Sequence, residues 1–231
     1  MAGVQHVLVV GASRGLGFEL TRVALSASTR VTAVARPPAP ALQELRAQHE
    51  AALTIAFADV CSDAELQAAA EGLGDARFDA IVYNAAIHRG GDDILEASAD
   101  DMLSTLDVNA VGAARVVRYF RPRLADGGLL ALISSEAGSI GGSGRQSEYG
   151  YCMSKAALNM LARLLGNREK QLRSGVHVVA IQPGWIRTDM GGPRADLAPD
   201  EAARDLWRLL EKRAITAGPP FVDRLNEPLA W

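Results

Sequence analysis

The chain has 231 residues, of which 48% are hydrophobic and 22% charged, values close to globular averages that argue against disordered and fibrous classes. The net charge of −3 argues against a nucleic-acid surface, which usually carries a basic excess. No apolar run approaches the roughly 18 residues of a membrane-spanning helix, and residues 1–10 lack the features of a signal peptide. Two cysteines are too few for a disulfide framework or a four-thiolate metal site. We therefore expect a cytoplasmic protein with a single dinucleotide-binding and catalytic domain over residues 1–231, and no membrane or nucleic-acid partner.

Short apolar runs alternate with segments of helical periodicity along the whole chain. The apolar runs are 7–10, 31–34, 53–57, 80–83, 129–133 and 176–181, with a weaker one at 220–222. The segments with helical spacing are 16–26, 40–49, 63–73, 100–124, 151–172 and 199–212. Continuous apolar runs are typical of strands buried on both faces of a parallel sheet. The alternation predicts an α/β fold: a Rossmann-type doubly wound parallel sheet of about seven strands, with helices on both faces in a three-layer sandwich.

A glycine-rich turn follows the first predicted strand and opens the first predicted helix. Its sequence is Gly11-Ala-Ser-Arg-Gly15-Leu-Gly17. Glycines permit a tight turn and close approach of the backbone to a pyrophosphate, and the helix N-terminus presents N–H groups to the phosphates. The alternative is an ordinary glycine-rich turn, but the position after the first strand favours a dinucleotide site.

A second motif begins the predicted helix 151–172. Tyr151 and Lys155 are four residues apart and therefore share one face of that helix. An ammonium group beside a phenol favours the phenolate, so we expect Lys155 to lower the pKa of Tyr151 from its usual value of about 10. Tyr151 is thus a candidate general acid or base. Tyr149 is a weaker candidate, because the residue four positions later is Met153, which carries no charge.

Both motifs, in this order, resemble the short-chain dehydrogenase/reductase family over essentially the whole chain. The resemblance implies a catalytic set of Asn109, Ser135, Tyr151 and Lys155. It also implies that the cofactor is contacted by Gly11, Ser13, Arg14, Gly15, Leu16, Gly17, Arg36, Asp59, Val60, Asn84, Ala85, Tyr151, Lys155, Pro183, Gly184, Ile186 and Thr188. Val10 and Ala86 depart from the family pattern, which usually has threonine and glycine there.

The loop between Ser135 and Tyr151 points to one branch of the family. The serine lies 16 residues before the tyrosine, whereas in the family it usually lies 13 before. This longer loop, the segment around Pro183-Gly184 and the final residues 226–231 resemble the sniffer- and C-signal-type carbonyl reductases.

The resemblance implies hydride transfer between a nicotinamide and a carbonyl compound or secondary alcohol. Tyr151 would donate the proton, Lys155 would bind the nicotinamide ribose, and Ser135 would donate to the developing alkoxide. Asn109 would hold a water that links Lys155 to solvent. Ser134 and Ser135 point to opposite faces of an extended strand, and the resemblance favours Ser135. The alternative is a non-catalytic NADP-binding sensor or signalling protein on the same fold.

The end of the second predicted strand indicates which cofactor binds. Enzymes that prefer NAD usually carry a carboxylate there, but this strand ends in Arg36 with no carboxylate nearby in the sequence. Arg36 is placed to meet a 2′-phosphate, with Arg14 on its other side and Ser13 assisting. We therefore expect NADP(H) rather than NAD(H). The alternative for Arg36 is a solvated loop residue before Pro37.

Two helices and the dispersed histidines complete these expectations. Apolar residues occupy more than one face of the predicted helices 100–124 and 151–172, which predicts a homodimer, with a tetramer as the alternative. These residues include Ala113, Ala114, Val117, Ala157, Leu161 and Leu164.

The histidines form no metal-ligand pair. We expect His177 to pack in the core, with pocket lining by His88 a minor alternative, and Trp185, Ile186 and Met190 to line the substrate pocket.

Overall fold

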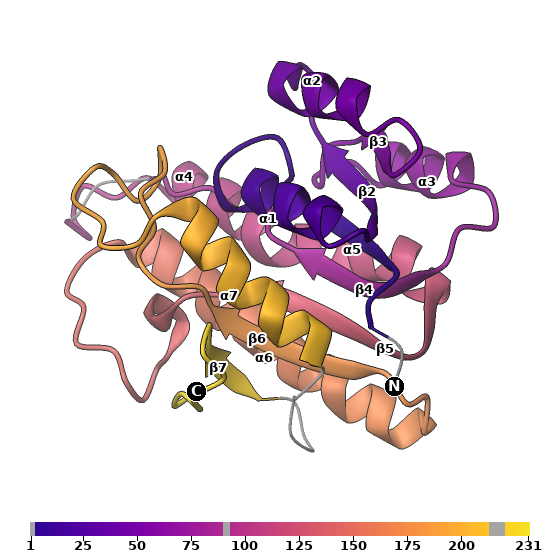
Figure 1. Ribbon diagram of the computed structural model, residues 1–231. Helices are drawn as coiled ribbons and strands as arrows, with labels where there is room; N and C mark the ends of the chain where they lie inside the picture. Colours follow the sequence, from indigo (N-terminus) through magenta and orange to yellow (C-terminus); the bar gives the residue numbers. More distant parts are fainter. Residues whose placement is uncertain (1–2, 90–92, 213–219) are drawn as a thin grey trace.

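A computed structural model describes residues 3–89, 93–212 and 220–231 (Figure 1). Residues 1 and 2, which belong to the segment considered for a signal peptide, lie outside this description. Within the described residues, seven parallel strands form one sheet in the order β3-β2-β1-β4-β5-β6-β7. The strands are β1 (His6–Val10), β2 (Arg30–Ala35), β3 (Leu53–Phe57), β4 (Phe78–Tyr83), β5 (Leu124–Ile133), β6 (His177–Gln182) and β7 (Phe221–Asp223). The predicted Rossmann-type sheet is confirmed.

Helices cover both faces of this sheet and complete three layers. They are α1 (Gly15–Ser26), α2 (Pro40–Gln48), α3 (Asp63–Gly72), α4 (Ala99–Leu106), α5 (Gly112–Phe120), α6 (Tyr149–Leu172) and α7 (Pro199–Lys212). Helices α1, α2 and α7 pack on one core cluster, and α3, α5 and α6 pack on another. Figure 1 shows α1 and α7 in front of the sheet and α5 and α6 behind it.

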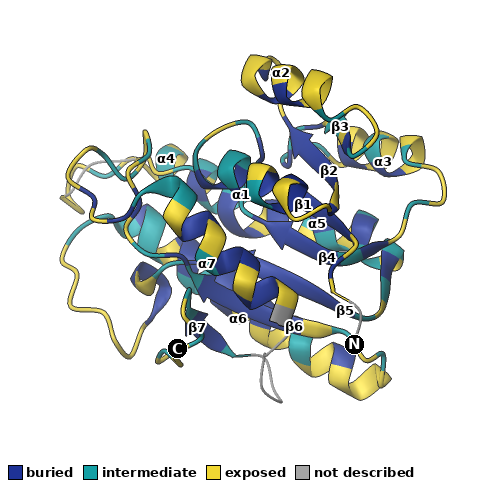
Figure 2. Cartoon of the chain, in the orientation of Figure 1, coloured by how far each residue is buried: buried dark blue, intermediate teal, exposed yellow. Residues whose placement is uncertain are grey.

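The central strand shows why the sequence builds this sandwich. All five residues of β1 are buried, with Val7 and Val9 in one core cluster and Leu8 and Val10 in the other. Successive side chains of a strand point to opposite faces, so an unbroken apolar run fits only a strand covered on both sides. Figure 2 shows the sheet as the buried centre of the molecule, with exposed residues on the outer faces of the helices.

The strand order places a binding edge beside β1. The chain runs outward from β1 to β2 and β3, then returns to β4 on the other side. Ligands of open α/β sheets bind at such a reversal, past the carboxyl ends of the strands. Val10 of β1 is aligned with Tyr83 of β4, so the turns that follow these two strands lie side by side.

The predicted helix 100–124 is in fact four segments. Helix α4 ends at Leu106, a π-helical turn spans Asp107–Val111, and α5 runs from Gly112 to Phe120 before a short 3₁₀ turn at Arg121–Arg123. Pro122 lacks an N–H group and cannot continue the helix. Strand β5 therefore begins at Leu124 rather than 129, and its register shifts between Phe78 and Ala80 of β4.

The placement predicted for His177 is wrong. This residue is the first of β6 and is exposed, because it lies at the amino end of the strand, ahead of the four buried residues that follow. Among the described residues, no helix is long and apolar enough to cross a membrane. Nor do three or more histidine, cysteine, aspartate or glutamate side chains gather in those ranges in a way that could hold a metal ion.

Candidate active site

A cavity of about 840 Å³ opens at the carboxyl ends of the strands. The turns after β1, β2, β3, β4, β5 and β6 all contribute to its lining. Every predicted site residue lines it except Gly17 and Asn109. The predicted site residues are spread along the sequence from position 11 to position 188, and the fold brings them together around this cavity.

The glycine turn lies against the turn that follows β4. A Cβ atom on Gly11, whose φ is +84°, would lie 2.6 Å from the backbone nitrogen of Ala85. A Cβ on Gly17 would lie 2.2 Å from the carbonyl oxygen of Gly11. Asn84 donates from Nδ2 to that same carbonyl at 3.0 Å. Gly17 therefore does not face the cavity; it permits the tight packing that gives the turn its shape.

Two arginines stand at the mouth of the cavity, each beside a carboxylate. Arg14 Nη1 lies 2.8 Å from Asp189 Oδ2, and both side chains are largely exposed. Arg36 Nη1 lies 3.5 Å from Asp59 Oδ2. No carboxylate lies near Arg36 in the sequence, but β3 pairs with β2 and brings Asp59 beside it in space. A phosphate at this position would compete with Asp59 and Asp189 for the two guanidinium groups.

The two adjacent serines after β5 have different partners. Ser134 is buried and donates to Oδ1 of Asn159 at 2.6 Å. Ser135 accepts a hydrogen bond from the N–H of Ala137 at 3.1 Å, and its hydroxyl lies near enough to Tyr151 to oppose the rise in the pKa of the phenol. The serine favoured from the sequence is therefore the one that meets the tyrosine.

Tyr151 and Lys155 face each other at the start of α6. Lys155 Nζ lies 5.6 Å from the centre of the Tyr151 ring and donates to the carbonyl oxygen of Ile133 at 2.8 Å. Burial lowers the pKa of Lys155 to about 7. Burial also raises the pKa of Tyr151, opposed by the hydrogen bond from Ser135. The expected lowering of this pKa by Lys155 is wrong, since desolvation dominates and the ammonium is directed at a backbone carbonyl.

Asn109 lies beneath the cavity, in the π-helical turn, and is fully buried. Its Oδ1 accepts from the N–H of Ile87 at 2.8 Å, and its Nδ2 donates to the carbonyl of Ile87 at 2.9 Å. The same Nδ2 donates to Oγ of Ser154 at 2.9 Å. The side chain thus ties the turn after β4 to helix α6. Its predicted role in holding a water stays a prediction.

A family model described as short chain dehydrogenase matches residues 5–197. The chain belongs to the short-chain dehydrogenase family. C-signal of Myxococcus xanthus is 34% identical over 133 residues, which cover 57% of this chain and 79% of that protein. These findings confirm the family and branch predicted from the motifs.

Two solved structures resemble this short-chain dehydrogenase closely along its length. One is a short-chain dehydrogenase/reductase from Burkholderia multivorans with bound NADP, with 30% identity, a TM-score of 0.92, and coverage of 99% of this chain and 100% of that one. The other is a carbonyl reductase from Pseudomonas aeruginosa in complex with NADP, with 34% identity, a TM-score of 0.86, and coverage of 98% and 99%.

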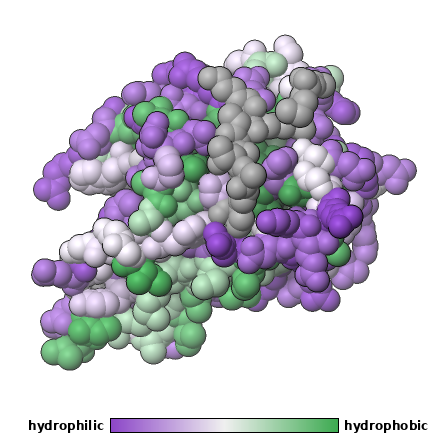
Figure 3. Space-filling view, turned by 90° about the horizontal axis from the view of Figure 1, so that it is seen from below, coloured by the Kyte–Doolittle hydropathy of each residue, from purple (hydrophilic) through white to green (hydrophobic). Residues whose placement is uncertain are grey.

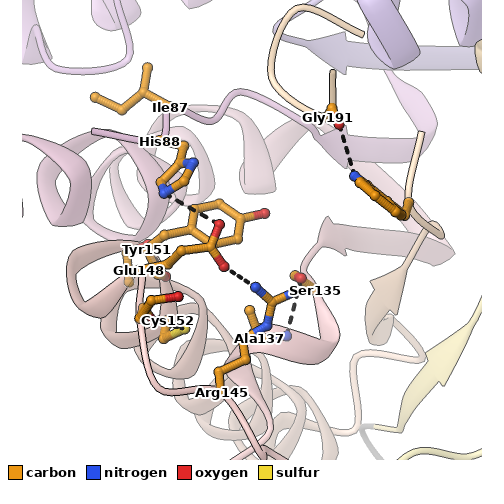
Figure 4. Close-up of polar contacts among 12 residues, drawn as sticks. Ile87, His88, Ser135, Ala137, Arg145, Glu148, Tyr151, Cys152 and Gly191 are labelled. Carbon is orange, nitrogen blue, oxygen red and sulfur yellow. Dashed lines mark hydrogen bonds and ion pairs between the residues drawn. The ribbon is translucent and has the colours of Figure 1, made fainter. Parts of the chain in front are cut away.

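This short-chain dehydrogenase carries a group of ionisable side chains beside Tyr151 that sequence reasoning largely missed. We call Glu136, Arg145, Glu148 and His88 the charged array; all four line the cavity. The His88 ring centre lies 5.1 Å from that of Tyr151, and its Nε2 lies 3.6 Å from Glu148 Oε1. Figure 4 shows His88 beside Tyr151, with Glu148 between His88 and Arg145. The only signal in the sequence was the long loop before Tyr151, which contains three of the four residues.

The segment after β6 contributes three apolar side chains to the cavity, together with polar and charged ones such as Arg187 and Asp189. Trp185, Ile186 and Met190 all line the cavity, as expected, although Ile186 is buried and the other two are exposed. Trp185 donates from its indole nitrogen to the carbonyl of Gly191 at 2.9 Å. That bond fixes the indole, and Gly191 lies across the open cavity from Tyr151 in Figure 4.

Proposed function

We propose that this short-chain dehydrogenase is an NADPH-dependent carbonyl reductase, acting on C=O in one direction and on secondary CH–OH in the other. The observation that carries the proposal is the meeting of Ser135, Tyr151 and Lys155 at the cavity that begins at the glycine turn. Family membership and the NADP bound by the related Burkholderia and Pseudomonas proteins support it. We also propose that residues 1–231 act as one dinucleotide-binding and catalytic domain in the cytoplasm.

Each side chain has a role that its surroundings support. A bound nicotinamide supplies the hydride, and the protein positions the carbonyl carbon against it. Tyr151 gives its phenolic proton to the carbonyl oxygen, because it lines the cavity near Ser135. Ser135 donates a hydrogen bond to the same oxygen as negative charge develops there. Lys155, whose Nζ lies 5.6 Å from the centre of the Tyr151 ring, would bind the nicotinamide ribose.

The glycine turn and the two mouth arginines would hold the phosphates of the cofactor. The N-terminus of α1 provides backbone N–H groups for the pyrophosphate, since Arg14 at its N-cap makes no capping bond with its side chain. Arg36 and Arg14 would bind the 2′-phosphate if they exchanged their carboxylate partners for it. Asp59 and Val60 line the cavity beyond β3, where the adenine would lie.

The experiment that tests this function measures NADPH oxidation by the full chain. The panel consists of aldehydes, ketones and quinones at moderate salt, with NADH as the comparison cofactor. We expect turnover of several neutral carbonyl compounds with NADPH and weaker turnover with NADH. Tight NADPH binding without oxidation of the cofactor by any member of the panel would favour the sensor alternative.

We also propose that the protein forms a homodimer, with a tetramer as the alternative. Ala113 packs in the core, but Ala114 of α5 and Leu164 of α6 are exposed, as are Leu103 of α4 and Met160 of α6. Figure 3 shows hydrophobic residues gathered toward the lower edge of the face seen from below. A second copy covering α4, α5 and α6 would bury these side chains. Light scattering at micromolar protein tests this, and a mass of one chain contradicts it.

A further inference from the structure

The turn that carries Ser135 is held on both sides by one side chain of α6. We call residues 134–138, which include the 3₁₀ segment Glu136–Gly138, the serine turn. Ser134 Oγ donates to Asn159 Oδ1 at 2.6 Å, and Asn159 Nδ2 donates to the carbonyl oxygen of Gly138 at 3.1 Å. Both hydrogen bonds are buried. The amide of Asn159 thus joins the first and last residues of the serine turn, with Ser135 between them.

The hydrogen bonds within the serine turn fix its shape but not its place beside Tyr151. Ser135 Oγ accepts from the N–H of Ala137 at 3.1 Å, and the Ser135 carbonyl oxygen accepts from the N–H of Gly138 at 2.9 Å (Figure 4). Such local bonds move with the turn, whereas Tyr151 belongs to α6. The position of Ser135 relative to Tyr151 therefore depends on contacts between the turn and that helix.

Asn159 follows Tyr151 and Lys155 along one side of α6. The three residues are spaced by four positions, so each lies about one helical turn beyond the one before it. Tyr151 and Lys155 line the cavity, whereas Asn159 does not and is only 4% exposed. The serine turn packs closely here, because a Cβ atom on Gly138 would lie 2.6 Å from the carbonyl carbon of Lys155. One side of α6 thus carries Tyr151 and Lys155 and also holds the turn that provides Ser135.

We propose that Asn159 is a positioning residue, which places the hydroxyl of Ser135 beside Tyr151 for carbonyl reduction. The inference rests on the proposed function, because it uses the role assigned to Ser135 there. Asn159 does not line the cavity, so its effect on the substrate passes through the serine turn. A hydrogen-bond donor stabilises a developing oxyanion well only when it is already directed at that oxygen. A displacement of about 1 Å can lower a rate by about a hundredfold.

The test is a double-mutant cycle between Asn159 and Ser135 in the full chain. The readouts are kcat and KM for 4-nitrobenzaldehyde and for the panel member that the unmodified protein reduces fastest, each with saturating NADPH. Ser135→Ala removes one donor to the oxyanion and should lower kcat about a hundredfold or more. Asn159→Ala should lower kcat about tenfold to about a hundredfold. Because Asn159 acts through Ser135, kcat of the double variant should stay within about twofold of that of Ser135→Ala.

A milder variant and a matched control separate positioning from stability. Ser134→Ala removes the hydroxyl that donates to Asn159 but leaves the bond to Gly138, so it should lower kcat less than Asn159→Ala does. Thr29→Val also removes a buried hydrogen bond, from Thr29 Oγ1 to the carbonyl oxygen of Val4 at 3.0 Å, but lies outside the cavity. Both variants should be less stable in urea, and only Ser134→Ala should lose kcat.

Fluorescence titration with NADPH separates positioning of Ser135 from a general displacement of α6. Lys155, one turn before Asn159, would bind the nicotinamide ribose, so a displaced helix would also weaken cofactor binding. We expect the dissociation constant of NADPH to change little in Asn159→Ala and in Ser134→Ala. The KM of the carbonyl compound should also change much less than kcat, because the hydrogen bond from Ser135 strengthens in the transition state.

Three outcomes overturn the inference. The first is a double variant in which the two losses of kcat multiply, since Asn159 would then act independently of Ser135. The second is an unchanged kcat in either Asn159→Ala or Ser135→Ala. The third is a loss of NADPH affinity that matches the loss of kcat, which would mean that Asn159 holds α6 in place. If Asn159→Ala does not fold, the cycle is run with Ser134→Ala in its place. Failure of the unmodified protein to reduce any member of the carbonyl panel would instead refute the proposed function.

Discussion

The side-chain nitrogen of Asn109 lies 2.9 Å from the hydroxyl oxygen of Ser154, and this bond joins the π-helical turn to the helix that carries Tyr151 and Lys155. The same side chain makes both hydrogen bonds to the backbone of Ile87. One buried amide therefore fixes three elements of the cavity relative to one another: the turn after β4, the π turn and α6.

Replacing Asn109 by alanine tests this positioning role. The change leaves the partly buried N–H and C=O of Ile87 without their partner, and an unsatisfied buried group costs about 1–3 kcal/mol. We expect the free energy of unfolding to fall by about 2–4 kcal/mol and kcat to fall with it, as measured by urea unfolding and NADPH oxidation. Asn167→Ala, at an exposed position of α6, is the control. Unchanged stability and kcat in Asn109→Ala would show that the three hydrogen bonds position nothing.

Replacing Tyr151 by phenylalanine separates proton transfer from cofactor binding. The variant keeps the ring packed beside His88 but loses the only proton that Tyr151 can donate. We expect turnover to be abolished while the dissociation constant of NADPH changes little. Tyr149→Phe is the matched control, because its hydroxyl donates to the backbone of Gln146. A comparable loss of cofactor affinity and turnover in Tyr151→Phe would contradict the assigned role.

Arg36 provides the test of cofactor preference. A charge-assisted hydrogen bond contributes about 1.5–3 kcal/mol, so one arginine on the 2′-phosphate should favour NADPH by roughly tenfold to about a hundredfold. Arg36→Asp puts a carboxylate there, beside Asp59, and should reverse the preference in fluorescence titrations with NADPH and NADH. Arg46→Gln on α2 should change neither affinity. Equal affinity of the unmodified protein for both cofactors would show that neither Arg36 nor Arg14 reaches the phosphate.

The lowered pKa of Lys155 predicts how the free energy of unfolding depends on pH. Burial lowers this pKa from 10.5 to about 7, so between these two values the unfolded chain binds a proton that the folded chain does not. The free energy of unfolding therefore rises with pH above about 7, by at most about 1.4 kcal/mol per pH unit from this group. In Lys155→Met this contribution is absent. Urea unfolding from neutral to alkaline pH should show the two stability curves diverging, and parallel curves would contradict the prediction.

The fold and the position of the cavity could be predicted because both depend on local sequence. Buried strands read as apolar runs, and the motif residues follow those strands directly, so the parallel sheet brings them to one edge. The start of β5 was missed because Gly127 and Gly128 within it read as a turn. The π turn was missed because it spans only five residues, too few for a change of helical periodicity to be recognised in the sequence.

The charged array and the pKa of Tyr151 could not be predicted for a different reason. The position of Glu148 depends on a left-handed backbone conformation, with φ of +60°, which the sequence does not signal for glutamate. The pKa of Tyr151 depends on how completely the surrounding elements bury the phenol, and the spacing to Lys155 contains no information on burial.

A buried ion-pair cluster at the far end of α6 gives the last prediction. Glu169 is only 3% exposed and accepts hydrogen bonds from Arg121 at 3.0 and 2.5 Å, from Arg168 at 2.8 Å and from Ser174 at 2.5 Å. Removing one partner of a fully buried pair usually costs about 3–5 kcal/mol, and because Arg121 and Arg168 are partly exposed, Glu169→Gln should destabilise the fold by less than that. Activity per folded molecule should be unchanged, because none of these residues lines the cavity.

The pH dependence of this effect has a definite sign. The hydrogen bond from Arg121 holds the pKa of Glu169 below its usual value of 4.5, so the unfolded chain takes up this proton first as the pH falls. The stabilisation that the charged form of Glu169 provides is complete above about pH 4.5. It is lost as the pH falls through the lowered pKa of Glu169 in the folded protein. Urea unfolding of the wild type and Glu169→Gln should therefore converge in acid, whereas Glu44→Gln should track the wild type. A stability gap of constant size down to pH 3 would show that Glu169 acts through packing alone, without its charge.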